Sequence, residues 1–222
     1  MAATNEEEDI NIQCRGTSLE QVSQFKYLGV LITSDCNCGR EIYARLGAAR
    51  SAISSLSTLW KDRALSRSIK LRLLKSLVWP IATYGAESWT LKKDSIKKLE
   101  AFEMYGYRRI LRVSWTEHRT NHSILEELRT TRQLVATIKR RKLQYFGHVT
   151  RAEKLSALIL QGKIEGRRLR GRPRRRWQDD VMEWTKRSMA ECTSAARGRE
   201  RWRKVVTSAM ISDLQAHEDG PR

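Results

Sequence analysis

The stretch REIYARLGAARSAISSL, residues 40–56, decides the fold class. Its apolar residues Ile42, Leu46, Ala49 and Ile53 recur at the spacing that places side chains on one face of an α-helix. The rest of the chain keeps this helical character. We therefore predict a mainly α protein, a helical bundle followed by a basic linker and a small C-terminal helical unit.

The sequence before this helix instead alternates apolar and polar residues, as a β-strand does. Ile10, Ile12 and Cys14 fall on one face of an extended segment, and a turn signal follows at Gly16-Thr17. The run VSQFKYLGVLIT, residues 22–33, is rich in β-branched and aromatic side chains. We predict two or three strands, including a small N-terminal β-hairpin.

Cap and breaker residues divide the helical part. Ser66 is a suitable N-cap for a second helix that Pro80 kinks or ends, and Asp94 opens a third helix that should pack on the second. Further helices are expected in three stretches: residues 123–130, 131–150 and 153–161.

A glycine- and arginine-rich stretch with few apolar residues predicts a boundary between packed parts. Pro173 then suits the first turn of a helix whose Trp177, Val181 and Trp184 share a face. The predicted organisation is a β-hairpin region (1–39), a helical bundle (40–161), an Arg/Gly-rich linker (162–172), a C-terminal helical pair (173–211) and a disordered tail (212–222).

The charge balance points to a polyanionic partner. The chain has 43 Lys and Arg against 25 Asp and Glu, a formal net charge of +18. Nucleic acid fits this excess better than an anionic membrane surface or a merely soluble basic surface. No apolar run is long enough to span a bilayer, and the acidic segment 5–9 is unlike a signal peptide. We predict an intracellular protein, located in the nucleus.

Two clusters concentrate the basic charge. Residues 166–177 contain seven arginines and no acid, a composition suited to neutralising phosphates. Within them, Arg170-Gly-Arg-Pro173 matches an AT-hook core, although a solvated linker or a nuclear-import signal explains it equally well. Residues 139–142 lie on an amphipathic helix. The predicted nucleic-acid-binding residues are Lys139, Arg140, Arg141, Lys142, Arg167, Arg168, Arg170, Arg172, Arg174, Arg175 and Arg176.

Metal, cofactor and catalytic sites are not predicted. His118 and His122 are four residues apart, but no nearby Cys-x-x-Cys supplies the other ligands that zinc needs. The pair Asp179-Asp180 lies on a helical stripe without flanking strands, unlike the paired aspartates with which polymerases hold two metal ions. We interpret the pair as acids stabilised by the dipole at the start of a helix.

An ordered series of short motifs resembles one known family. It includes FKYLG (25–29), ITSD (32–35), YGAE (84–87), YFGHV (145–149) and GRPR (171–174) followed by Trp177 and Asp180. The series, over residues 20–206, is similar to the C-terminal part of the endonuclease/reverse transcriptase polyproteins of LINE-type, non-LTR retrotransposons.

The resemblance implies a role for each region. Phe25, Lys26, Tyr27, Leu28 and Gly29 would correspond to the primer-grip hairpin at the end of the palm. Residues 40–112 would form the thumb that holds a template–primer duplex, and the basic segments beyond them the post-thumb region. The family's catalytic aspartates lie upstream of the part that this chain resembles, so no catalytic residue is carried over. The Cys/His cluster found in some lineages is also missing.

Three functional hypotheses follow. The first is a non-catalytic fragment of an RNA-directed DNA polymerase that binds RNA, DNA or a hybrid duplex by phosphate contacts. The second is a thumb supplied in trans to a separate catalytic half, and the third is a decayed fragment with no selected function. Apolar surface left by a missing palm would favour self-association.

Overall fold

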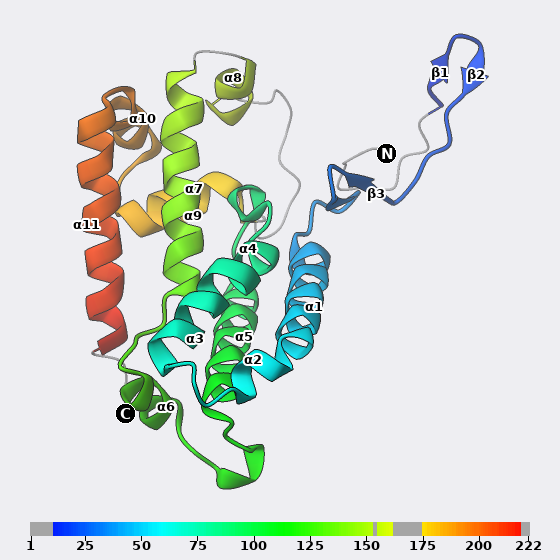
Figure 1. Cartoon of the computed structure of the whole chain (residues 1–222). Helices are drawn as coiled ribbons and strands as arrows, with labels where there is room; N and C mark the ends of the chain where they lie inside the picture. Colours follow the sequence, from blue (N-terminus) through cyan, green and yellow to red (C-terminus); the bar gives the residue numbers. More distant parts are fainter. Residues whose placement is uncertain (1–10, 153–154, 162–174, 219–222) are drawn as a thin grey trace. The chain divides into compact units, whose positions relative to one another are not determined.

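The computed structural model describes residues 11–152, 155–161 and 175–218, and it is mainly helical (Figure 1). Its contacts divide the chain into two compact units. Unit 1 contains the described residues up to Gly85 together with Lys97–Thr130, and unit 2 contains Ala86–Ile96 and the described residues from Thr131 on. Helix α5, Lys93–Leu111, contributes its first turn to unit 2 and the remainder to unit 1.

Two antiparallel hairpins precede the helices. Strands β1 (Gln13–Cys14) and β2 (Thr17–Ser18) form the first, and β3 (Gln24–Tyr27) and β4 (Val30–Thr33) form the second. The predicted hairpin is therefore confirmed. The extended run reverses at Leu28 and Gly29, whose φ angles are 46° and 81°. Two successive positive φ values define the tight turn that matches the twist of the flanking strands.

Unit 1 is built around the face of α1 that the sequence predicted. Ile42, Leu46, Ala49 and Ile53 are all at most 4% exposed. The helical elements of this unit are α1 (Gly39–Ser55), α2 (Ser57–Lys61), α3 (Arg67–Leu73), a π-helical turn (Leu74–Val78), α4 (Trp79–Ala82), most of α5, a 3₁₀ turn (Trp115–Glu117) and α6 (Asn121–Leu128).

The second predicted helix begins as expected, because the Ser66 side chain accepts a hydrogen bond from Ile69 N. Pro80, predicted to kink or end this helix before Tyr84, lies in the first turn of α4, where a missing N–H costs no hydrogen bond. The π-helical turn Leu74–Val78 interrupts the helix just before Pro80, and α4 ends at Ala82. The predicted packing of the third helix on the second is also present. Gly106 of α5 comes so close to Leu74 that an added Cβ would lie 3.1 Å from its side chain.

Unit 2 places a long helix, α7 (Leu134–Arg151), against α10 and α11. Its other elements are a 3₁₀ turn (Ala86–Ser88), α8 (Leu155–Gln161), α9 (Trp177–Thr185), α10 (Met189–Arg197) and α11 (Arg199–Glu218). The core joins Leu143 and Phe146 of α7 to Val181, Cys192 and Trp202 from the three later helices.

The domain boundaries predicted from the sequence need correction. Helix α7, expected within the 40–161 bundle, belongs to the same unit as α9–α11, because its apolar face is covered by Trp202 and its neighbours. The predicted C-terminal pair contains three helices, and α11 continues through the predicted tail to Glu218. Residues 162–174, which include Pro173 and all of the predicted linker, lie outside the described residues.

Helices α7 and α11 approach each other closely at a glycine. A Cβ on Gly147 would lie 2.3 Å from Trp202 Cδ1, so no larger residue fits there without a shift. The Trp202 indole N–H also donates to the carbonyl of Leu143 at 2.7 Å. Among the described residues, no helix is both long enough and apolar enough to cross a membrane.

Candidate nucleic-acid interface

The turn of the β3–β4 hairpin is fixed by two side chains of unit 1, one from α1 and one from the turn after α4. Arg45 of α1 donates to the carbonyl of Gly29, and its guanidinium lies 4.5 Å from the centre of the Tyr84 ring. The Tyr84 hydroxyl in turn donates to the carbonyl of Leu28 at 2.9 Å. The two turn carbonyls are thereby bound from outside the hairpin, which holds the turn against α1.

A buried carboxylate completes this attachment. Glu41 is 4% exposed; it accepts from the Arg45 guanidinium at 2.6 Å and from the backbone N–H of Leu31 at 2.8 Å. A single acidic side chain thus connects the first turn of α1 to strand β4. No short-range pattern predicts this link, because Glu41 is marked locally only as a residue near a helix start.

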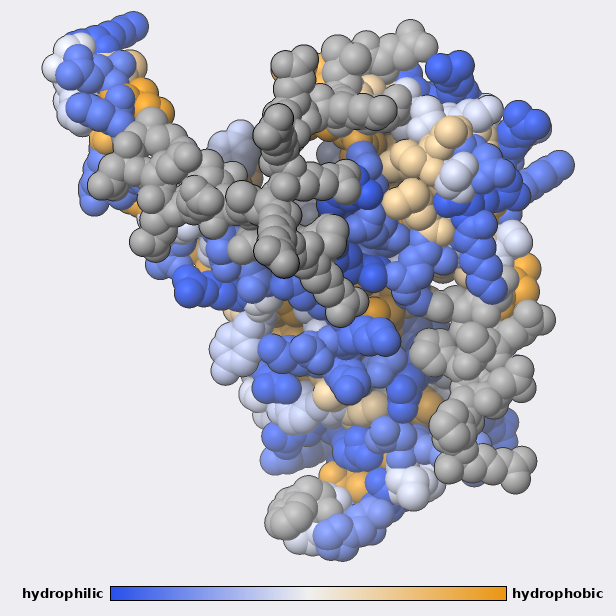
Figure 2. All heavy atoms as spheres, turned by 180° about the vertical axis from the view of Figure 1, so that it is seen from behind, coloured by the Kyte–Doolittle hydropathy of each residue, from blue (hydrophilic) through white to orange (hydrophobic). Residues whose placement is uncertain are grey.

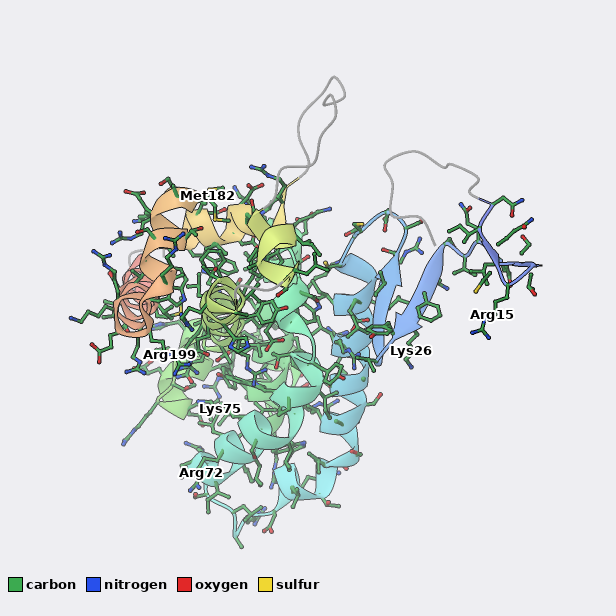
Figure 3. All side chains as sticks on the ribbon, turned by 90° about the horizontal axis from the view of Figure 1, so that it is seen from above. Arg15, Lys26, Arg72, Lys75, Met182 and Arg199 are labelled. Carbon is green, nitrogen blue, oxygen red and sulfur yellow. The ribbon has the colours of Figure 1, made fainter. Side chains whose placement is uncertain are left out.

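The residues that resemble a primer grip are gathered in this hairpin and remain exposed. Phe25 and Tyr27 share one face of β3 and are 53% and 58% exposed, and Leu28 at the turn is 74% exposed. Lys26, also exposed, falls on the opposite face of the strand and is labelled in Figure 3. The hairpin therefore offers two aromatic rings and a cation to a partner.

The basic cluster of α7 is divided between the interior and the surface. Lys139 and Lys142 are 8% and 0% exposed, whereas Arg140 is exposed and Arg141 is half-buried. The helical period turns the two lysines onto the apolar face of α7. Lys142, predicted to contact a phosphate, stabilises the interior of unit 2 in this structure, where a phosphate cannot reach it.

The Lys142 ammonium lies in a site made of one carboxylate, one carbonyl and two indoles. Its Nζ is 2.5 Å from Asp180 Oδ2 and donates to the carbonyl of Trp89 at 2.7 Å. The same atom is 4.5 Å from the centre of the Trp177 ring and 5.4 Å from that of Trp184. Buried charge is tolerated because ion pairing, hydrogen bonding and cation–π attraction all replace water.

Asp180 is the centre of this network. Its Oδ2 also accepts from the backbone N–H of Leu91 at 2.9 Å, and its Oδ1 accepts from Arg175 Nε at 2.7 Å. Arg175 forms a second ion pair with Glu183 at 2.5 Å. The prediction that Asp180 is an acid stabilised by the helix dipole did not include this role. The available signal was an acid at i+3 from Trp177, on the apolar stripe of α9.

The end of the predicted arginine-rich segment is neutralised by α9. Arg175 is held by Asp180 and Glu183, and the Arg176 guanidinium lies 3.2 Å from Asp179, which also accepts from Arg176 N. The other predicted arginines of this segment lie outside the described residues: Arg167, Arg168, Arg170, Arg172 and Arg174.

The residues weighed as metal ligands do not assemble a site in the described part of the chain. His118 and His122 are both exposed, and no three His, Cys, Asp or Glu side chains come together there to hold a metal ion. Asp179 and Asp180 bind cationic side chains of the protein itself.

The chain is similar to a transposon-derived protein. This relative, an uncharacterised protein of Caenorhabditis elegans, is 28% identical over 202 residues, which cover 86% of this chain and 72% of the relative. The similarity indicates a transposon origin. No protein-family model and no solved structure matches the chain.

Proposed function

We propose that this chain is a non-catalytic part of a retrotransposon reverse transcriptase that binds nucleic acid through phosphate contacts. The transposon-derived relative supports the origin, and the ordered motifs from Phe25 to Trp177 support the reverse-transcriptase part of the proposal. Binding without catalysis follows from the same resemblance, since the matched part of the family excludes its catalytic aspartates.

The observation that carries the proposal is the positive charge remaining on the surface. Acidic residues neutralise the buried Lys142 and the half-buried Arg175, but the chain as a whole retains a net charge of +18. Hydrophilic residues dominate the face of the molecule in Figure 2. In unit 1, the exposed basic residues of the β3–β4 hairpin and α1 include Lys26, Arg40 and Arg50. Cations in such positions attract the phosphates of a polyanion without reading its sequence.

The β3–β4 hairpin adds a different kind of contact. Exposed aromatic rings at Phe25 and Tyr27 can stack on unpaired bases or sugars, and Lys26 can approach a phosphate. Their attachment to α1 through Arg45 lowers the entropy lost on binding, because the turn is already ordered. This chemistry agrees with the primer-grip role that the resemblance implies.

The test is fluorescence anisotropy of the purified chain with labelled duplex DNA, RNA–DNA hybrid and single strands. If six to ten phosphates are contacted, affinity should fall by roughly 10³- to 10⁵-fold between about 50 and 200 mM salt. Replacing Arg167, Arg168, Arg170, Arg172 and Arg174 by Gln should reduce the salt slope, while Arg175 and Arg176 keep their pairs within α9.

The sample must also show a cooperative thermal transition, since an unfolded basic chain binds polyanions as well. Binding that is absent at low salt, or that does not change with salt, would contradict the proposal. A folded chain without binding would favour a protein-interaction module, and the lack of any folding transition would favour a decayed fragment.

A further inference from the structure

A cluster of basic side chains surrounds the corner between α10 and α11. Residues 186–204 contain seven Lys and Arg against two Glu. Five of the seven, Arg197, Arg199, Arg201, Arg203 and Lys204, lie at the end of α10 or in the first turns of α11, and all five are exposed. We call these five residues the α10–α11 ridge; Arg199 is labelled in Figure 3.

In the described part of unit 2, the ridge differs from the Arg175–Arg176 pair in having no acidic partner. Among the described residues, none of its five side chains forms an ion pair, whereas Arg175 and Arg176 are each paired with acids of α9. The acid nearest in sequence, Glu200, leaves a large excess of positive charge. A polyanion binding here would not have to displace an internal carboxylate.

The backbone of the ridge is fixed by its attachment to α7. Trp202, in the middle of the ridge sequence, is 3% exposed and donates to the carbonyl of Leu143. Arg151 of α7 donates to the carbonyl of Ala196 at 2.7 Å, close to the end of α10. These contacts order the helix before any ligand binds, so binding loses mainly side-chain entropy.

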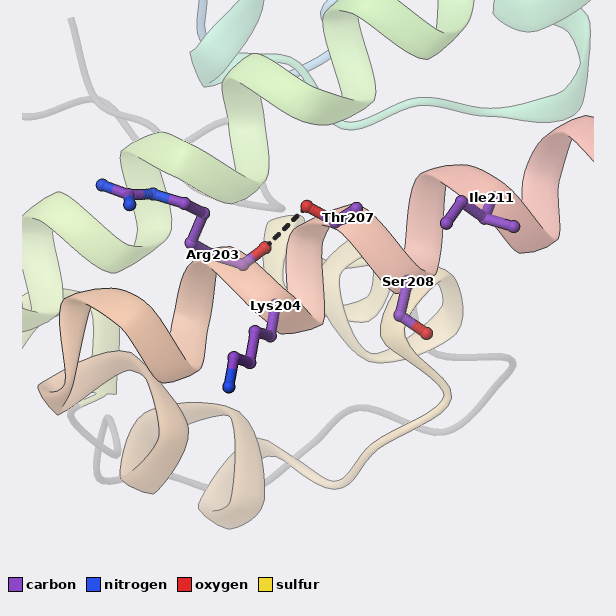
Figure 4. Close-up of a pocket in the computed structure, with 5 residues that line it drawn as sticks. All are labelled: Arg203, Lys204, Thr207, Ser208 and Ile211. Carbon is purple, nitrogen blue, oxygen red and sulfur yellow. Dashed lines mark hydrogen bonds between the residues drawn. The ribbon is translucent and has the colours of Figure 1, made fainter.

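The C-terminal end of the ridge borders an open hollow on α11. Arg203, Lys204, Thr207, Ser208 and Ile211 line a shallow hollow of about 410 Å³, with Arg203 and Lys204 projecting to different sides of the helix (Figure 4). Arg199 and Lys204 are five residues apart, roughly 7.5 Å along α11 at 1.5 Å per residue. A duplex carries about four charges over that length.

We propose that the α10–α11 ridge binds the backbone phosphates of duplex nucleic acid. This inference rests on the proposed function and deepens it by assigning a surface and a form of ligand. Within residues 197–211 the aromatic side chain is that of Trp202, which is buried, so the ridge has no ring for stacking on unpaired bases. A duplex carries one charge per about 1.7 Å, twice the axial density of one of its strands, and suits a surface that offers charge alone.

The experiment compares two variants with the same loss of charge. The ridge variant carries Arg199→Gln, Arg201→Gln, Arg203→Gln and Lys204→Gln. The control carries Arg63→Gln, Arg72→Gln, Lys97→Gln and Lys98→Gln, at four exposed positions of unit 1. Each is titrated with a labelled duplex of about 20 base pairs and with one of its strands, across roughly 50 to 200 mM salt.

The ridge variant should lose about 3 to 4 units of salt slope on the duplex. Its duplex affinity should therefore fall about 100-fold less between about 50 and 200 mM salt than the affinity of the unchanged protein. The control should keep most of its slope. A double variant, Arg201→Gln with Lys204→Gln, should lose about half as much as the ridge variant and serves if the fourfold change disturbs folding. Circular dichroism and the thermal midpoint check that each variant retains the fold.

Equal losses of salt slope in the ridge and control variants would overturn the assignment of the ridge as the duplex-binding surface. The proposed function would remain intact, since binding would then depend on total charge. A loss confined to the single strand would also overturn that assignment. Failure of the unchanged protein to bind either probe would instead contradict the proposed function itself.

Discussion

Two basic regions of unit 2 use their charge in opposite ways. Around Lys142 and Arg175, the cations are covered by indoles and neutralised by Asp180 and Glu183. Along the α10–α11 ridge, the cations are exposed and, among the described residues, without ion pairs. The density of Lys and Arg in the sequence is high in both regions. What separates a structural cation from one available to a ligand is the position of acidic residues in the fold.

The largest effect should come from removing the counter-charge of the buried region. Asp180→Asn leaves the Lys142 ammonium 0% exposed and without its carboxylate, so we expect a loss of about 3 to 5 kcal/mol in the free energy of unfolding. Adding Lys142→Met should restore most of that loss, because the buried ammonium that lacks a counter-charge is then removed. Denaturant unfolding measures both variants. If the free energy of unfolding of Asp180→Asn lies within about 1 kcal/mol of that of the unchanged protein, the Lys142–Asp180 pair does not stabilise unit 2.

A smaller effect is expected where α7 supports the ridge. Gly147→Ala would place a Cβ 2.3 Å from Trp202, so overpacking should cost about 1 to 3 kcal/mol. Gly47→Ala is the matched control, since a Cβ there meets no atom within 4 Å in the middle of α1 and should stabilise the helix by up to about 1 kcal/mol. Thermal unfolding compares the two. Equal effects of both substitutions would rule out the close contact between α7 and α11.

The smallest effect concerns an acid that the ridge does not use. Hydrogen bonds from the side chain and backbone of Ser188 lower the pKa of Glu191 in the capping box of α10. Because the folded pKa is the lower one, this contribution to stability is present above the unfolded pKa and is lost as pH falls through the folded pKa. Glu191→Gln should therefore lower the thermal midpoint near pH 6 but hardly at about pH 3. A difference that stays constant with pH would contradict this assignment.

Much of the fold follows from short-range patterns. The buried face of α1 was predicted from the spacing of four apolar residues, and Ser66 was predicted as a cap from its position before an apolar run. The turn at Leu28-Gly29 was not resolved within the extended run, because Leu28 is not a typical turn residue. The helix α10 was missed because its buried side is made of Cys192, Ala195 and Ala196, which give a weak apolar pattern.

The candidate interface was less predictable. The exposed hairpin was identified from its motif, but the anchoring roles of Glu41, Arg45 and Tyr84 depend on contacts between separate elements. The ridge was not identified at all, since its arginines are interrupted by Glu200 and Trp202 and were outnumbered by those of residues 166–177.

The sequence by itself determined the helical character, the β-hairpin and the large positive charge, because these depend on residue periodicity, local turn chemistry and composition. Only the tertiary structure decided which cations are structural. Lys142 and Asp180 are 38 residues apart, and Leu91 and Asp180 are 89 apart. Their pairing is set by the way α7, α9 and the segment around Trp89 pack together, and burial makes that pairing obligatory, since a lone charge in the interior would cost several kcal/mol.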